Sequence, residues 1–106
     1  MSSTLRLRAL KTNESGDYLT YDEMKSILSD LTTQVTDELK DHLAVSGYSP
    51  DFTVMHTGWE FNGPTCYARF LLTATPSATT TDTLESIICP FESNYGLLLS
   101  EAPASW

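Results

Sequence analysis

A hydrophobic pattern over residues 20–47 constrains the fold of this chain more than any other feature of its sequence. Hydrophobic side chains recur there in steps of three and four residues, which places them along one side of an α-helix. Thr20 with Glu23 forms a capping-box pattern at the start, and Gly47 suits the left-handed backbone that ends a helix. The sequence therefore predicts one long helix whose buried side is made by Met24, Ile27, Leu28, Leu31, Val35, Leu39 and Leu43.

Alternating side chains before this helix, and a turn signal after it, predict β-strands. Residues 4–10 alternate strictly between apolar and mainly polar positions, as a half-buried strand does. Asn62-Gly63 is a strong signal for a two-residue hairpin turn, and it predicts strands over residues 51–61 and 64–75. The helix is thus expected to lie between a first strand and a hairpin.

The predicted hairpin has one face suited to the core and one mixed face. If the turn closes a two-residue loop, Phe61 lies opposite Pro64 and Trp59 lies opposite Cys66. The mixed face remains open to solvent or to a partner. The core face consists of Met55, Trp59, Phe61, Cys66, Ala68, Phe70 and Leu72.

The last third of the chain favours one more helix and one more strand. Asp82 with Glu85 offers a second capping pair, and the apolar spacing over residues 82–91 predicts a short amphipathic helix ended by Pro90. The β-branched residues of the same segment also suit a strand, so both interpretations stay open. Residues 95–100 are apolar enough for a last strand.

The resulting order β-α-β-β-α-β is that of a ferredoxin-like sandwich, a split βαβ fold of the α+β class. Two helices would cover one face of a four-stranded antiparallel sheet and leave the other face uncovered. Residues 1–101 are expected to form this single domain, and residues 102–106 a mobile C-terminal tail. Many unrelated functions share this fold, so it says little about function by itself.

The charge and the apolar content of the chain argue against two classes of partner. The formal net charge is −8, whereas nucleic acids and anionic membranes are bound by cationic surfaces. No apolar run approaches the roughly 20 residues that span a bilayer, and the N-terminus lacks a signal-peptide pattern, so a cytoplasmic location is expected. Cys66 and Cys89 are too few for a disulfide framework or a zinc site, and we expect buried free thiols.

Acidic residues form a row on the predicted helix. At 100° per residue, four of them fall within an arc of about 40° and two more flank that arc. No lysine or arginine stands four residues after Asp30 or Asp37 to neutralise them. The row is either a solvated outer face or a ridge that docks onto the basic groove of a protein that binds nucleic acid. Its members are Asp22, Glu23, Asp30, Asp37, Glu38 and Asp41.

The uncovered sheet face is the alternative site. The first and third strands are central neighbours in the predicted sheet, which brings all three arginines of the chain to this face. Such a face could bind a ligand or a second copy of the chain, although residues 65–72 lack the aromatic run of RNA-binding sheets. The residues concerned are Arg6, Arg8, His56, Tyr67 and Arg69.

Patterns for catalysis and for cofactor binding are missing from the sequence. His42 and His56 are the only histidines, and neither lies in a recognisable motif. Metal-ligand spacing, a phosphate-binding loop and a dinucleotide fingerprint are absent. We therefore expect a non-enzymatic acidic module without a cofactor or metal, which binds a basic protein as an inhibitor or nucleic-acid mimic. A ligand-binding or homodimerising sheet face is the alternative.

Overall fold

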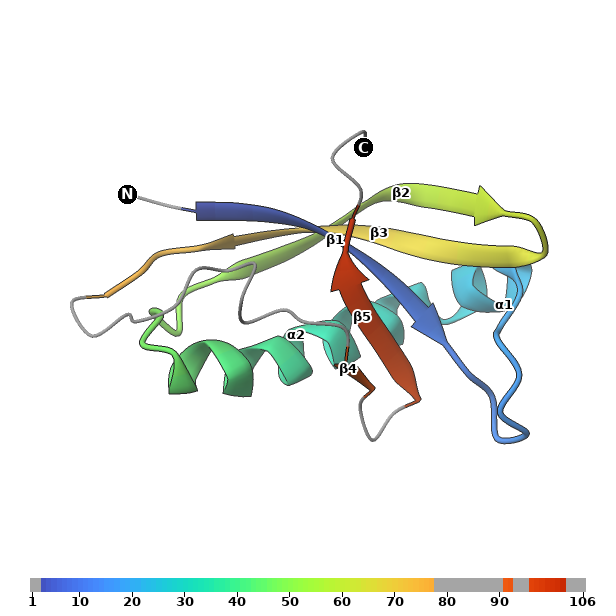
Figure 1. Cartoon of the computed structure of the whole chain (residues 1–106), viewed down its shortest axis with the longest axis horizontal. Helices are drawn as coiled ribbons and strands as arrows, with labels where there is room; N and C mark the ends of the chain where they lie inside the picture. Colours follow the sequence, from blue (N-terminus) through green and yellow to red (C-terminus); the bar gives the residue numbers. More distant parts are fainter. Residues whose placement is uncertain (1–2, 78–90, 93–95, 103–106) are drawn as a thin grey trace.

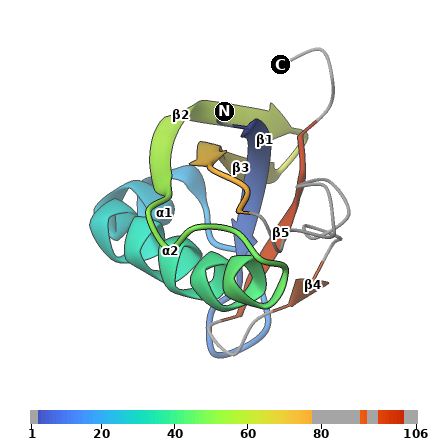
Figure 2. The same cartoon turned by 90° about the vertical axis from the view of Figure 1, so that its left-hand side faces the viewer.

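The computed structural model describes residues 3–77, 91–92 and 96–102, which form an antiparallel sheet with helices on one face. The sheet has the order β2-β3-β1-β5-β4, and each neighbouring pair is antiparallel. Figures 1 and 2 show both helices on the same side of the sheet. The elements are β1 (Ser3–Lys11), α1 (Tyr21–Ser26), α2 (Leu28–Val45), β2 (Thr53–Asn62), β3 (Thr65–Ala74), β4 (Phe91–Glu92) and β5 (Leu97–Glu101).

The α+β class is confirmed, but the ferredoxin-like order is not. Both described helices lie between β1 and β2, and the described sheet has a fifth strand because β4 pairs with β5. The second helix was predicted over residues 82–91, of which 82–90 lie outside the described residues. Phe91 begins β4 and pairs with Leu99. Pro90 has no N–H to continue a helical hydrogen-bond ladder, and the residues after it make sheet pairs instead.

The predicted long helix is interrupted at Ile27, which separates α1 from α2. Ile27 has φ −117° and ψ 19°, which lie outside the helical range. The hydroxyl of Ser26 donates to the carbonyl oxygen of Glu23 at 2.7 Å, and the N–H of Ile27 bonds to Met24 at 3.2 Å. The hydroxyl of Ser26 thus bonds to the carbonyl oxygen that a regular helix would offer to the N–H of Ile27. The prediction of one continuous helix over residues 20–47 is wrong at this point.

Both predicted ends of the helical segment are confirmed. The capping box between Thr20 and Glu23 is present in full. Gly47 has φ 83°, a conformation that costs glycine no steric strain. The N–H of Tyr48 donates to the carbonyl oxygen of Leu43 at 3.0 Å, which is the six-to-one hydrogen bond of a Schellman motif. These caps fix where the helical segment begins and where it ends.

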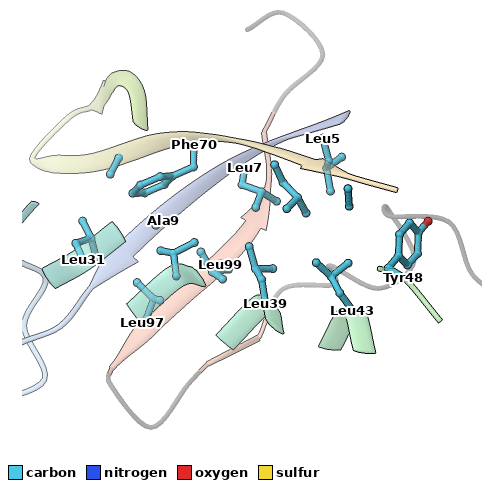
Figure 3. Close-up of a cluster of buried hydrophobic side chains, with 14 of the residues drawn as sticks. Leu5, Leu7, Ala9, Leu31, Leu39, Leu43, Tyr48, Phe70, Leu97 and Leu99 are labelled. Carbon is cyan, nitrogen blue, oxygen red and sulfur yellow. The ribbon is translucent and has the colours of Figure 1, made fainter. Parts of the chain in front are cut away.

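The buried side of α2 packs against the sheet and forms the hydrophobic core. Leu31, Val35, Leu39 and Leu43 are at most 1% exposed, which confirms the predicted apolar stripe of this helix. In Figure 3 the leucines of α2 point toward those of β1 and β5, with Phe70 of β3 in the same cluster. Burying one such side chain contributes about 1.5–3 kcal/mol, so this side of α2 is firmly anchored.

The turn of the hairpin differs from the predicted one. Asn62 already pairs with Thr65, so the two loop residues are Gly63 and Pro64. Gly63 has φ 60°. A glycine with positive φ at the first loop position is the pattern of a type II′ turn, whose twist matches that of the flanking strands. The expected Asn62-Gly63 loop is therefore wrong by one position.

The register of the hairpin is shifted by two residues from the prediction. Trp59 pairs with Ala68 rather than with Cys66, and Phe61 has Cys66 as its partner. Because the shift is even, these side chains remain on the predicted side of the sheet. The prediction that Phe61 is part of the core is nevertheless wrong: it is 62% exposed, since it stands next to the hairpin turn, where its ring contacts that of Tyr21 with ring centres 5.3 Å apart. Cys66 and Ala68 are accordingly buried, as predicted.

A β-bulge reverses the two faces in the first half of β2. The register shifts between His56 and Gly58, so Thr57 is the extra residue of the bulge. Met55, predicted in the core, is 56% exposed. His56, predicted on the uncovered face, instead pairs with Phe70 on the core side. Both corrections have the same cause, because one extra residue inverts the alternation of every side chain before it.

Ala102 attaches the end of the described chain to β1. Its N–H donates to the carbonyl oxygen of Arg6 at 2.9 Å, and the residue is 8% exposed. The first residue of the predicted tail over residues 102–106 is thus held against the sheet. The remainder of that segment lies outside the described residues.

Candidate functional site

Carboxylates stand on the exposed side of α2, opposite its core side. Asp30, Asp37 and Asp41 are exposed, and the helical geometry places them within about 40° around the axis and over about 16 Å of its length. Glu38 lies next to them and is half-buried. These four residues are named the acidic row below.

The acidic row carries charge that its surroundings do not neutralise by contact. In the part of the chain that the structure describes, the salt bridges join Arg8 to Glu60 and Lys25 to Asp22, and none reaches the row. Asp37 and Asp41 are one helical turn apart, where like charges disfavour each other by a few tenths of a kcal/mol. The row is therefore a source of negative potential on a fixed helix.

Asp22 and Glu23 belong to α1, so the break at Ile27 separates them from the acidic row. The carboxylate of Glu23 accepts the N–H of Thr20 at 3.0 Å. This hydrogen bond, and secondly the one with the Thr20 hydroxyl, holds the pKa of Glu23 below its usual 4.5. Asp22 lies 3.9 Å from the ammonium group of Lys25. These two carboxylates interact at the start of α1, on the other side of the break at Ile27 from the acidic row.

The uncovered sheet face brings together Arg8 and three side chains from three other strands. The guanidinium group of Arg8 lies 4.6 Å from the ring centre of Tyr67 and 3.5 Å from the carboxylate of Glu60. Its Nε donates to the hydroxyl of Ser100 at 3.2 Å. Arg8 is thus held from both sides of β1, and we assign it to the stability of this face rather than to a ligand. Sequence reasoning missed Ser100, because the register of β5 could not be predicted.

Arg6 and Arg69 lie on the same uncovered face, as predicted. Arg6 of β1 pairs with Leu71 of β3. Two residues further along β1, Arg8 pairs with Arg69. Arg6 is exposed and Arg69 is half-buried. Together with Tyr67 they form the basic and aromatic cluster that was expected from the strand pairing.

His56 is the predicted member that the structure removes from this face. Its ring lies 4.8 Å from that of Trp59 and 5.6 Å from that of Phe70, both measured between ring centres. Its Nε2 atom is buried and has no hydrogen-bond partner among the described residues. The inward position of His56 could have been predicted from Gly58, because a glycine within a strand often marks a bulge.

Comparisons with known proteins show no similarity. The chain matches no protein-family model, and no curated protein or solved structure matches it. Within the described ranges no helix has the length and apolar content to cross a membrane. The same residues contain no group of three or more acidic, histidine or cysteine side chains that could hold a metal ion.

Proposed function

We propose that this chain is a cytoplasmic, non-enzymatic module that binds a basic protein through the acidic row of α2. The observation that carries the proposal is the anchoring of this helix. The side opposite the row is at most 1% exposed at Leu31, Val35, Leu39 and Leu43, so the carboxylates are presented on a rigid support. A pre-positioned charged surface binds without losing conformational freedom in its backbone.

The charge of the row selects the chemistry of the partner. An exposed negative row attracts a complementary positive groove, which speeds association and discriminates against acidic partners. Proteins that bind nucleic acid carry such grooves, because they must neutralise phosphates. The proposed action is therefore to occupy the groove in place of nucleic acid, as an inhibitor or a nucleic-acid mimic would.

Capture experiments with charge-matched variants test this proposal. Three forms of the chain are immobilised and exposed to a lysate of the source organism: wild type, the triple variant D30N/D37N/D41N, and the control E14Q/D17N/D51N. The control removes the same number of carboxylates from exposed loop positions, so the net charge of the two variants is equal. The proposal predicts that a basic protein is retained by wild type and control, and lost from the triple variant.

A second step separates mimicry from simple charge attraction. The recovered protein is mixed with wild-type chain and a labelled oligonucleotide, and the bound oligonucleotide is measured by fluorescence anisotropy. Displacement of the oligonucleotide by wild type, and not by the triple variant, is the expected result. Equal retention of the partner by all three forms would overturn the proposal.

A further inference from the structure

Three aromatic side chains meet where α1 lies against the turn end of the β2–β3 hairpin (Figure 1). The ring of Tyr21 contacts that of Trp59, with ring centres 5.0 Å apart, and that of Phe61, with ring centres 5.3 Å apart. Both contacts are edge-on, at interplanar angles of 86° and 70°. Tyr21, Trp59 and Phe61 are named the aromatic patch below.

The aromatic patch connects the core to the surface. Trp59 is half-buried and packs against the core, whereas Phe61 is 62% exposed. Because Tyr21 contacts both of them, the exposed ring of Phe61 is supported by rings that are themselves packed. A supported ring binds a partner with little loss of side-chain freedom, and such aromatic residues carry much of the binding energy at protein interfaces.

A contact of Tyr21 indicates that the aromatic patch attracts a cation. The ammonium group of Lys25 lies 4.5 Å from the centre of the Tyr21 ring. The faces of aromatic rings carry partial negative charge, so a cation over a ring face is attracted to it. Phe61, which is more exposed than Tyr21, offers a further ring to a cation from outside the chain.

The charge next to the aromatic patch also favours a cation. α1 carries the carboxylates of Asp22 and Glu23 against the single ammonium group of Lys25. The side chain of Asp22, next to Tyr21 in the sequence, is 91% exposed. Asp30 stands in the first turn of α2, so the acidic row begins directly after the helix that carries Tyr21. Carboxylates and rings therefore attract the same class of group.

We propose that the aromatic patch anchors an arginine side chain of the basic partner protein, with the guanidinium group stacked on Phe61. Arginine fits this role better than lysine, because its planar guanidinium group is more weakly hydrated and stacks on aromatic faces. This role rests on the proposed function, which supplies the basic partner. The acidic row attracts that partner, and the aromatic patch holds it once it is bound.

Nuclear magnetic resonance titration of the ¹⁵N-labelled full chain with tetra-arginine tests this role, with tetra-lysine as the probe of equal charge. At about 50 mM salt, tetra-arginine should move the amide signals of residues 21, 59 and 61 and the indole signal of Trp59 in a saturable way. Tetra-lysine should move these signals less at the same concentration. The amide signals of residues 30, 37 and 41 report separately on the acidic row, which should respond to both peptides.

Substitutions of Phe61 separate stacking from attraction by charge, since none of them changes the net charge. Phe61→Leu keeps an apolar side chain beside Tyr21 but removes the ring, and it should weaken the binding of tetra-arginine at the patch about two- to fivefold. Phe61→Tyr keeps the ring and should bind as wild type does. Val45→Ala shortens a side chain of α2 that is 90% exposed, and it should leave the affinity unchanged.

Three results would overturn the proposal. The first is movement at residues 30, 37 and 41 without movement at residues 21, 59 and 61, which would leave the proposed function standing without the aromatic patch. The second is equal affinity of Phe61→Leu and Phe61→Tyr for tetra-arginine. The third is movement of the patch signals on raising the protein concentration without a peptide, which would show that a second copy of the chain covers the patch. Movement at the patch alone would support the arginine site and contradict the role of the acidic row.

Discussion

The ring of His56 lies edge-on to the ring of Phe70, with ring centres 5.6 Å apart, on the face of the sheet that the helices cover. The ring of Trp59 also lies close to the imidazole, with ring centres 4.8 Å apart. The imidazole thus contacts two aromatic rings, and its buried Nε2 atom has no hydrogen-bond partner in the described structure. A buried polar atom without a hydrogen-bond partner is expected to cost stability, so His56 can be tested by substitution.

Replacing His56 by phenylalanine should raise the free energy of unfolding by about 1 kcal/mol. An unsatisfied buried polar atom costs about 1–3 kcal/mol, and an apolar ring of similar shape removes that cost. Urea denaturation measures the change. His56→Gln retains a buried polar group and should give no such gain. A loss of more than 1 kcal/mol in His56→Phe would show that Nε2 has a partner, a water molecule for example.

The anchoring of α2 predicts a large cost for shortening its core side. Leu31 is 0% exposed, so Leu31→Ala should lower the free energy of unfolding by roughly 2–5 kcal/mol. Val45, at the end of the same helix, is 90% exposed, and Val45→Ala should stay within about 0.5 kcal/mol of wild type. Equal and small effects of the two substitutions would mean that α2 is peripheral to the core.

The buried thiol of Cys66 predicts a loss of stability in alkali. Burial raises the pKa of Cys66 above its ordinary 9.0. Above that pH the unfolded thiol ionises while the folded one keeps its proton, so unfolding releases a proton and stability falls as the pH rises toward the raised pKa. Denaturation at about pH 8 and pH 10 in a Cys89→Ser background measures this effect. Adding Cys66→Ala should make the decline smaller, and an unchanged decline would contradict the assignment.

The start of α1 predicts an effect of the opposite sign in acid. Hydrogen bonds from Thr20 lower the pKa of Glu23, so the folded state binds a proton there less readily than the unfolded state. The stabilisation by the carboxylate is present above pH 4.5 and is lost as the pH falls through the lowered pKa. Glu23→Gln keeps an acceptor but cannot titrate. Its stability should therefore decline less than that of wild type between pH 6 and pH 3, as measured by denaturation.

The sequence predicts those parts of this fold that depend on long, regular patterns. The stripe that includes Leu31 and Leu39 repeats over several turns, and alternation in β1 places Arg6 and Arg8 together, so each signal is reinforced many times. The candidate site on α2 and the arginines of the sheet face follow from these patterns. The residues that lie next to these arginines on neighbouring strands cannot be predicted from such patterns, because the register of the strands depends on turns and bulges.

Single residues decide the features that the sequence did not predict. The helix is interrupted at Ile27, where the hydroxyl of Ser26 donates to the carbonyl oxygen of Glu23, the acceptor that a regular helix offers to the N–H of Ile27. Thr57 adds one residue to β2 and thereby turns His56 inward and Met55 outward. Gly63 rather than Asn62 opens the hairpin loop. At each of these positions the structure depends on the balance between local hydrogen bonds and packing elsewhere. The periodicity of hydrophobic residues in the sequence does not show that balance.

The most direct test of the central claim is the association rate between this chain and the basic protein recovered with it. Rates are measured by stopped-flow fluorescence for wild type, D30N/D37N/D41N and E14Q/D17N/D51N, at about 50 and 300 mM salt. The acidic row predicts that the first variant associates at least about tenfold more slowly at the lower salt concentration, with a smaller difference at the higher one. The loop variant should remain close to wild type. If D30N/D37N/D41N associates as fast as wild type at low salt, the row is only a solvated face of α2.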